Sequence, residues 1–188
     1  MSLLIIGLLL WSGIHLFPSL ATGARNHLVN QFGLKRFKMV FALCIIFSLI
    51  AIVFGWRSIE PFDVYQPPEW GRHITFLLVL LTFILIVARR RKTNIKRVLR
   101  HPMLTGLVLW SIGHLFANGD NRSLLLFIWL GLWAVLEMIL ISKREGAWQK
   151  PDPMPVKSDV MTIVIGIIIF TVFLSLHPYI AGISLINT

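Results

Sequence analysis

The chain has 188 residues, of which 56% are hydrophobic and only 14% charged, and its mean hydropathy is +0.79. Soluble domains carry roughly a quarter charged residues, so this composition excludes an ordinary soluble domain and predicts a membrane protein. The net charge of +10 lies mainly between apolar runs, where topology signals are found, which argues against a nucleic-acid partner, and the single Cys44 excludes an intrachain disulfide or a thiolate metal cage.

Six apolar runs are candidates for helices that cross a lipid bilayer, which needs about 20 residues. They predict an all-α, polytopic integral membrane bundle with one domain over residues 1–188. The fourth run is the shortest, because its helix would rise about 24 Å against a hydrocarbon core of about 30 Å. The six predicted spans are Leu3–Leu20, Met39–Trp56, Trp70–Ala88, Pro102–Ala117, Ser123–Ser142 and Val160–Ala181.

The charge of the loops alternates along the chain. The first, third and fifth loops are basic, whereas the second carries −1 and the fourth is neutral. The positive-inside rule therefore places the odd loops in the cytoplasm and both termini in the periplasm. The first run lacks the basic n-region of a cleaved signal peptide, so we expect it to be retained as a span.

Short signals between the runs predict where helices begin and end. Pro102 suits the first turn of a helix, and Asn118-Gly119 suits a helix stop. Asp120 or Asn121 can cap the next helix, so the fourth and fifth spans should form a tight antiparallel hairpin. The proline-rich segments 60–70 and 146–155 are expected to be an outer loop at the membrane interface and a cytoplasmic turn.

Ionisable side chains inside the spans indicate function, because they are costly in lipid. His15, His114 and Glu137 qualify, while His73, His101 and His177 lie near span ends. Two histidines from two helices can hold a b-type haem through its axial positions, and the absence of C-x-x-C-H excludes c-type attachment. The alternative is structural, with each imidazole donating to a carbonyl one turn away and packing helices together.

The predicted depths bear on how these histidines pair. His15 lies about 8 Å from the cytoplasmic side and His114 about 18 Å, so His101 matches the depth of His15 better. Trp11 precedes His15 by one turn as Trp110 precedes His114, which puts indole and imidazole on one helix face. This spacing suits either the wall of a flat cofactor pocket or plain packing. Glu137 can be a proton acceptor, a partner of a histidine, or a structural partner of a loop arginine.

The chain resembles the NnrU family of bacterial inner-membrane proteins over nearly its full length. The likeness is carried by HLFPS, GLKRFKMVF, YQPPEWGRH, KRVLRHPMLTGLVLWSIGHLFANGD, SLLLFIWLGLWAVLEM and REGAW. It implies a multi-pass protein of the bacterial inner membrane associated with nitrite and nitric oxide respiration. A nitrite or nitric oxide reductase system is the implied partner.

The same family is similar to plant zeta-carotene isomerase, a membrane enzyme that uses a b-type haem. That resemblance implies a ligand thirteen residues after the histidine of the RHP tripeptide, which is His114 here, following His101. The best match for the second ligand is His15 in HLFPS. The isomerase has a further histidine at the position that Trp133 occupies in this chain. This departure bears on isomerase activity more than on haem binding.

Two other functions are compatible with the sequence. Arg100, His101, Pro102 and Gly106 resemble the core of isoprenylcysteine and phospholipid methyltransferases, with Leu104 in place of a tyrosine. That likeness implies S-adenosylmethionine bound at the cytoplasmic face by Arg100 and by Glu137 or Glu145. A noncatalytic membrane assembly factor is the third alternative. The chain has no phosphate-binding glycine loop, H-E-x-x-H or G-x-S-x-G motif.

Overall fold

A computed structural model describes residues 1–182 as a bundle of helices without named strands. Five helices are long and apolar enough to cross a membrane, and a sixth, of 16 residues, is shorter. The prediction of a polytopic all-α membrane bundle is thereby confirmed. The helices are α1 (Ser2–Leu20), α2 (Thr22–Phe32), α3 (Leu34–Arg57), α4 (Gly71–Arg90), α5 (Ile95–Val98), α6 (Pro102–Ala117), α7 (Asn121–Glu145) and α8 (Val156–Ala181).

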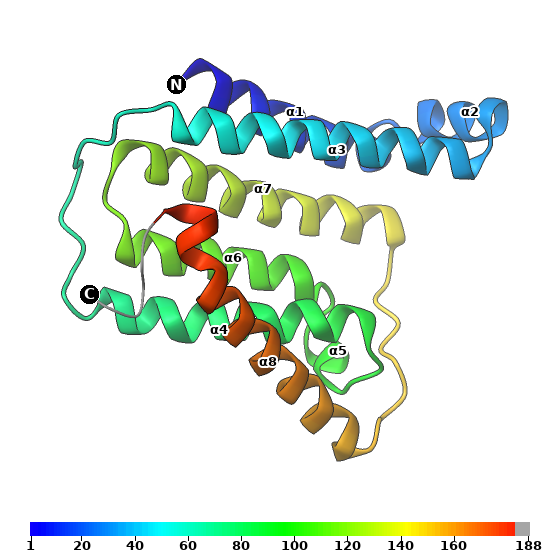
Figure 1. Ribbon diagram of the computed structural model, residues 1–188. Coiled ribbons are helices and arrows are strands. Elements are labelled where there is room, and N and C mark those ends of the chain that lie inside the picture. The colour runs from blue at the N-terminus through cyan, green and yellow to red at the C-terminus, as the bar shows by residue number, and fades with distance from the viewer. Residues whose placement is uncertain (183–188) are drawn as a thin grey trace.

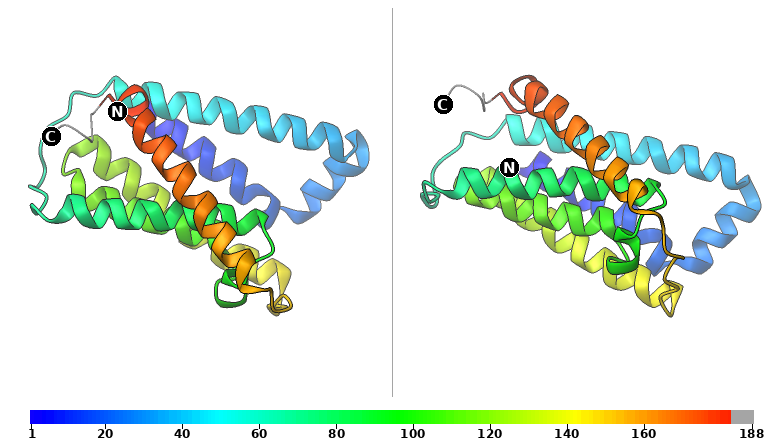
Figure 2. Two further views of the ribbon diagram at one scale, coloured as in Figure 1. Left: turned by 60° about the horizontal axis from the view of Figure 1, so that its bottom comes forward. Right: turned by 90° about the horizontal axis from the view of Figure 1, so that it is seen from below.

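The helices form two groups joined by α7 (Figure 1). One group is the antiparallel pair α1 and α3, and the other is α4 packed against both α6 and α8. Helix α7 packs on α6 and on α1, so it connects the groups along one side of the bundle. Helix α8 crosses the bundle obliquely, as both views of Figure 2 show.

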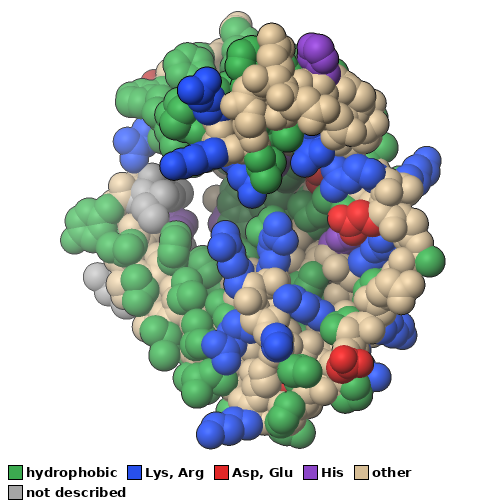
Figure 3. Space-filling model, turned by 90° about the vertical axis from the view of Figure 1, so that its right-hand side faces the viewer, with side chains coloured by type: hydrophobic (Ala, Val, Ile, Leu, Met, Phe, Trp, Pro, Cys, Tyr) green, Lys and Arg blue, Asp and Glu red, His purple; other side chains and the backbone are tan. Residues whose placement is uncertain are grey.

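The start of α1 and the end of α8 lie at the same end of the bundle, as six crossings require (Figure 1). Lys and Arg side chains gather around the opposite end, where α2 and the linker to α8 lie (Figure 3). A basic end is typical of the cytoplasmic side. Its placement there, and that of both termini in the periplasm, remain predictions, and the carboxyl terminus itself lies outside the described residues.

Helices extend beyond the predicted spans at the basic end. The first basic loop contains α2, and α3 begins at Leu34 rather than Met39. The third loop contains the short helix α5. Hydropathy marks the part of a helix that lies in lipid, whereas Lys and Arg continue a helix beyond it with their charged ends in water.

Helices α4 and α6 are held together by two threonines that face two glycines, each pair seven residues apart. The hydroxyl of Thr75 donates to the Gly113 carbonyl at 2.6 Å, and that of Thr82 donates to the Gly106 carbonyl at 2.8 Å. A methyl group added at Gly106 would lie 3.2 Å from the Thr82 carbonyl oxygen, so the two backbones are close. This seam fixes α6, including the turn that carries His114.

Removing one of these hydroxyls tests how much the hydrogen bonds between α4 and α6 stabilise the fold. We expect Thr82→Val to lower the free energy of unfolding by about 0.6 kcal/mol and at most about 1.7 kcal/mol, the range measured for hydrogen bonds between membrane helices. Thermal unfolding in detergent measures the change. The matched control is Thr171→Val, because Thr171 is exposed on α8 and bonds only to Ile167 of its own helix at 3.0 Å. Equal effects of the two substitutions would contradict the interhelical role.

The predicted hairpin between the fourth and fifth spans is confirmed. Helix α6 begins with Pro102 in its first turn, and the Asp120 carboxylate caps α7 by accepting from the Ser123 amide at 3.0 Å. The outer loop is bound to this hairpin, since the amides of Val64 and Tyr65 both donate to the Gly119 carbonyl. The non-helical loop between α3 and α4 thus covers the end of the bundle where α6 ends and α7 begins.

At the basic end of the bundle, a cluster of polar side chains that the sequence did not reveal connects separate segments of the chain. The Asp159 carboxylate, in the first turn of α8, accepts from the Thr93 hydroxyl at 2.5 Å and from the Asn94 amide at 2.8 Å. The Asn94 side chain also donates to the Met154 carbonyl at 2.7 Å. These contacts attach the start of α8 to the segment between α4 and α6.

Candidate functional site

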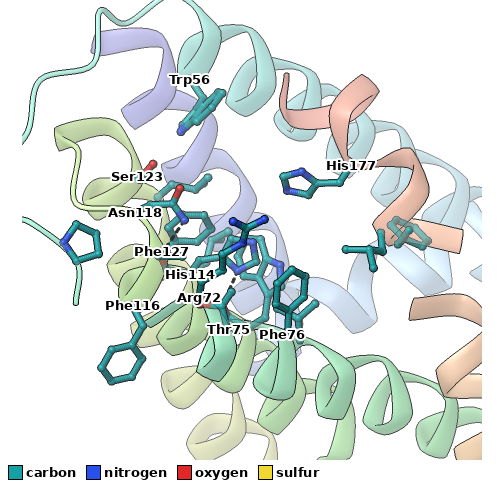
Figure 4. Close-up of a pocket in the computed structure, with 18 of the residues that line it drawn as sticks. Trp56, Arg72, Thr75, Phe76, His114, Phe116, Asn118, Ser123, Phe127 and His177 are labelled. Carbon is teal, nitrogen blue, oxygen red and sulfur yellow. Dashed lines mark hydrogen bonds between the residues drawn. The ribbon is translucent and has the colours of Figure 1, made fainter. Parts of the chain in front are cut away.

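A cavity of about 640 Å³ opens between the two helix groups, toward the end that carries the outer loop. Helices α1 and α3 form one wall, α4, α6 and α8 form the other, and α7 lies at its base (Figure 4). The lining is mostly aliphatic and aromatic. Its polar and charged side chains come from Arg57, Arg72, Thr75, His114, Asn118, Ser123 and His177.

His114 projects into this cavity from the last turns of α6. Its Nδ1 lies 2.8 Å from the Trp110 carbonyl oxygen. Because a carbonyl only accepts, Nδ1 carries the proton and Nε2 keeps its lone pair. The imidazole stacks on Phe127 with 4.5 Å between ring centroids, and it lies 4.6 Å from the Trp110 ring. The side chain is therefore held in one orientation with a nitrogen available to bind a metal.

His15 repeats this local geometry in different surroundings. Its Nδ1 lies 2.9 Å from the Trp11 carbonyl oxygen, and its ring packs against Trp11, Phe41 and Trp133. The imidazole does not line the cavity, whereas the Trp11 ring beside it does. The predicted placement of indole and imidazole on one face is thus confirmed in both helices, but the structure does not bring His15 and His114 to one cavity.

The α7 residues that His15 and His114 contact show how far apart the two histidines lie along the bundle axis. His15 contacts Trp133 and His114 contacts Phe127, and these two α7 residues are six positions apart. Six residues of helix rise about 9 Å. The depth difference expected from the sequence therefore persists in the folded bundle.

Arg100 and His101 lie at the other end of α6, away from the cavity. The Arg100 guanidinium lies 3.7 Å from the Glu145 carboxylate, and His101 Nε2 lies 2.8 Å from the Ser142 hydroxyl. Burial lowers the pKa of His101, and the neighbouring Arg100 and Arg89 cations lower it further, while Glu145 opposes them. Three of the residues singled out for methyl-donor binding thus lie close together as the end of α7 meets the start of α6.

Glu137 lies neither in the cavity nor in the cluster of Arg100, His101 and Glu145. It lies in α7 one turn after Trp133, only 8% of its surface is exposed, and its Oε2 has no hydrogen-bond partner. It does not line the cavity. Glu137 lies one turn from Trp133, which contacts His15. This position does not decide whether Glu137 is a proton acceptor, a partner of a histidine or a structural partner of an arginine.

The structure adds three side chains whose role the sequence did not predict. His177 lines the cavity from α8, and Arg57 and Arg72 line it from the outer ends of α3 and α4. The sequence placed all three near span ends, where polar residues are common. Only the oblique path of α8 and the packing of α4 bring them to one space, so no local pattern identifies them.

One contact network positions the outer wall of the cavity. Arg122, in the first turn of α7, lies over the Trp56 ring at 3.8 Å and donates to the Ile59 carbonyl at 3.0 Å. Its Nε lies 3.6 Å from the Asp120 carboxylate. Trp56 lines the cavity, so the hairpin between α6 and α7 fixes the end of α3 as well.

The fold and the cavity define a polytopic helical membrane protein with an apolar, histidine-bearing pocket near its outer end. Among residues 1–182 no group of three or more His, Cys, Asp or Glu side chains could hold a metal ion. The model of the NnrU protein family matches residues 3–185, so the chain belongs to this family. No curated protein and no solved structure matches the chain.

Proposed function

We propose that this protein binds a b-type haem in the cavity, with His114 as an axial ligand. The observation that carries the proposal is an apolar cavity into which an imidazole with an available Nε2 projects. Its volume of about 640 Å³ lies within the range of roughly 300–1,000 Å³ typical of cofactor sites.

The residues present fit such a group. Phe76, Phe83 and Phe127 offer flat apolar surfaces for a porphyrin, and Arg57 and Arg72, which also line the cavity, could bind its carboxylates. The hydrogen bond from Nδ1 to the Trp110 carbonyl raises the basicity of the coordinating nitrogen. When bound, a haem supplies an iron centre for electron transfer or for small-ligand binding.

The biological setting follows from the family likeness. We infer that the protein serves nitrite or nitric oxide respiration in the bacterial inner membrane, together with a nitrite or nitric oxide reductase system. A haem here can support a redox step, an isomerisation, or the function of a partner oxidoreductase. Trp133 stands where the related isomerase has a histidine, and it packs against both His15 and Trp11, which disfavours the isomerisation.

The methyltransferase alternative has weaker support. Arg100 and His101 do lie near Glu145, but Arg100 forms an ion pair with that same carboxylate. The basic-end pocket of about 530 Å³ is lined by other residues, among them Arg25, Lys38 and Arg144. Neither Arg100 nor His101 lines it.

An absorption spectrum of the detergent-purified protein, expressed with ample haem, tests the proposal. We expect a Soret band with α and β bands on reduction, and we expect His114→Ala to remove most of the bound haem because it deletes an axial bond. His27→Ala is the matched control, since His27 is exposed on α2 and outside the cavity. A colourless wild-type preparation would rule out haem binding and favour an assembly role.

A further inference from the structure

His177 is the second imidazole in the cavity. It lies on α8, across the cavity from His114 on α6, and both side chains project toward the same space (Figure 4). Helices α6 and α8 both pack on α4, and both contribute side chains to the lining of this cavity.

The depths of the two histidines also agree. His114 is three residues before the end of α6, and His177 is four residues before the end of α8. Along a helix these positions lie about 4.5 Å and about 6 Å from the same end of the bundle. His15 lies thirteen residues from the start of α1 at that end, which is about 20 Å.

Axial ligation sets a strict distance requirement. Bonds from a metal to imidazole nitrogen are about 2 Å long, so two axial nitrogens lie about 4 Å apart on opposite sides of the metal. The packing of His15 and His114 against α7 residues about 9 Å apart does not suit this geometry. His114 and His177 instead line one cavity at nearly the same depth, as two ligands of one group would.

We propose that His177 is the axial ligand opposite His114 and that Arg57 and Arg72 orient the haem by binding its carboxylates; this inference rests on the proposed function. Both arginines line the cavity, Arg57 as the last residue of α3 and Arg72 from the first turn of α4, so the haem edge that bears the carboxylates would face the loop between these helices. Guanidinium groups bind carboxylates through paired, charge-assisted hydrogen bonds. The α1 histidine then has a structural role, packed between Trp11 and Trp133.

A proline directly after His177 supports a fixed placement of the imidazole. Pro178 lies inside α8 and has no N–H, so the carbonyl of Leu174, a residue that lines the cavity, lacks its usual helical donor. The ring of Pro178 also restricts the backbone of the residue before it. The hydrogen bond that Pro178 removes therefore lies within one turn of His177, although α8 continues as a helix to Ala181.

Electron paramagnetic resonance and visible spectra of His177→Ala, His15→Ala and the wild type test the assignment. We expect a low-spin, six-coordinate wild type and an unchanged His15→Ala. His177→Ala should become high-spin and bind carbon monoxide rapidly when reduced, while the haem is retained through His114. His177→Met should restore six-coordination and raise the reduction potential, because a thioether ligand favours reduced iron.

Each contrary result has a distinct meaning. A low-spin His177→Ala together with a high-spin His15→Ala would overturn this assignment and identify His15 as the ligand. A high-spin wild type would also overturn it, while leaving haem binding at His114 intact. A wild type without haem would reject the proposed function and this inference together. Substituting Arg57 and Arg72 by glutamine should weaken haem retention without changing the spin state.

Discussion

Replacing Gly7 by leucine is expected to lower the free energy of unfolding by about 1–3 kcal/mol, the usual effect of overfilling a packed interface. Gly7 lies where α1 crosses α3. A methyl group added there would lie 2.7 Å from the backbone nitrogen of Ile52 and 2.9 Å from its side chain. Because backbone atoms cannot move aside as the end of a side chain can, the helices themselves would have to separate.

The effect should be specific to the contact between the helices. Gly55 on α3 faces the backbone of Leu4 equally closely, so α1 and α3 approach each other through glycines on both sides. Membrane helices pack in this way because lipid supplies no hydrophobic drive for their association. Separation of α1 from α3 would also displace Trp11 and Trp56, which both line the cavity.

Gly13→Leu is the matched control for this substitution. Gly13 is in the same helix and exposed, and a methyl group added there meets no atom within 4 Å. Thermal unfolding in detergent should show a fall of about 2–4 °C for each kcal/mol in the Gly7 variant. It should show little change in the Gly13 variant. Equal stability of the two variants would contradict close packing of α1 on α3.

Hydropathy was sufficient to predict the five long apolar helices and the shorter sixth, because it reflects how single residues interact with lipid and water. The fourth helix has the predicted bounds, Pro102–Ala117, since proline and the Asn-Gly pair are local signals. Helix α2 was missed because a helix outside the lipid has no hydropathy signal. The same is true of the contacts of Asp159 with Thr93 and Asn94, which join segments far apart in the chain.

The candidate site was predicted in part. His114 was identified because an ionisable side chain is energetically costly in lipid, and its one-turn spacing from Trp110 correctly placed the two rings on one helix face. The same reasoning selected His15 equally well, because it has the same local pattern. Which histidines share a cavity depends on the crossing of α8 over α4, a property of packing between helices. Local sequence therefore finds candidate ligands, but it does not pair them.

Filling the cavity should weaken haem binding while leaving every histidine in place. Val79 lies on α4, one turn after Thr75 and one turn before Phe83, and all three line the cavity. We expect Val79→Trp to occupy part of the space that a porphyrin needs. An overfilled site usually costs about 1–3 kcal/mol, which corresponds to about 5- to 150-fold weaker binding.

Leu77→Trp controls for the presence of a new indole on the same helix. Leu77 is 52% exposed and does not line the cavity, so its replacement should face lipid. The ratio of haem to protein, measured by absorbance after purification, should fall in the Val79 variant and stay at the wild-type value in the Leu77 variant. Undiminished haem in Val79→Trp would place the cofactor elsewhere, since a site around His15 would not be affected by bulk added to α4. The expected result, loss of haem only in the Val79 variant with thermal stability preserved in both variants, would locate the haem between α4 and α8.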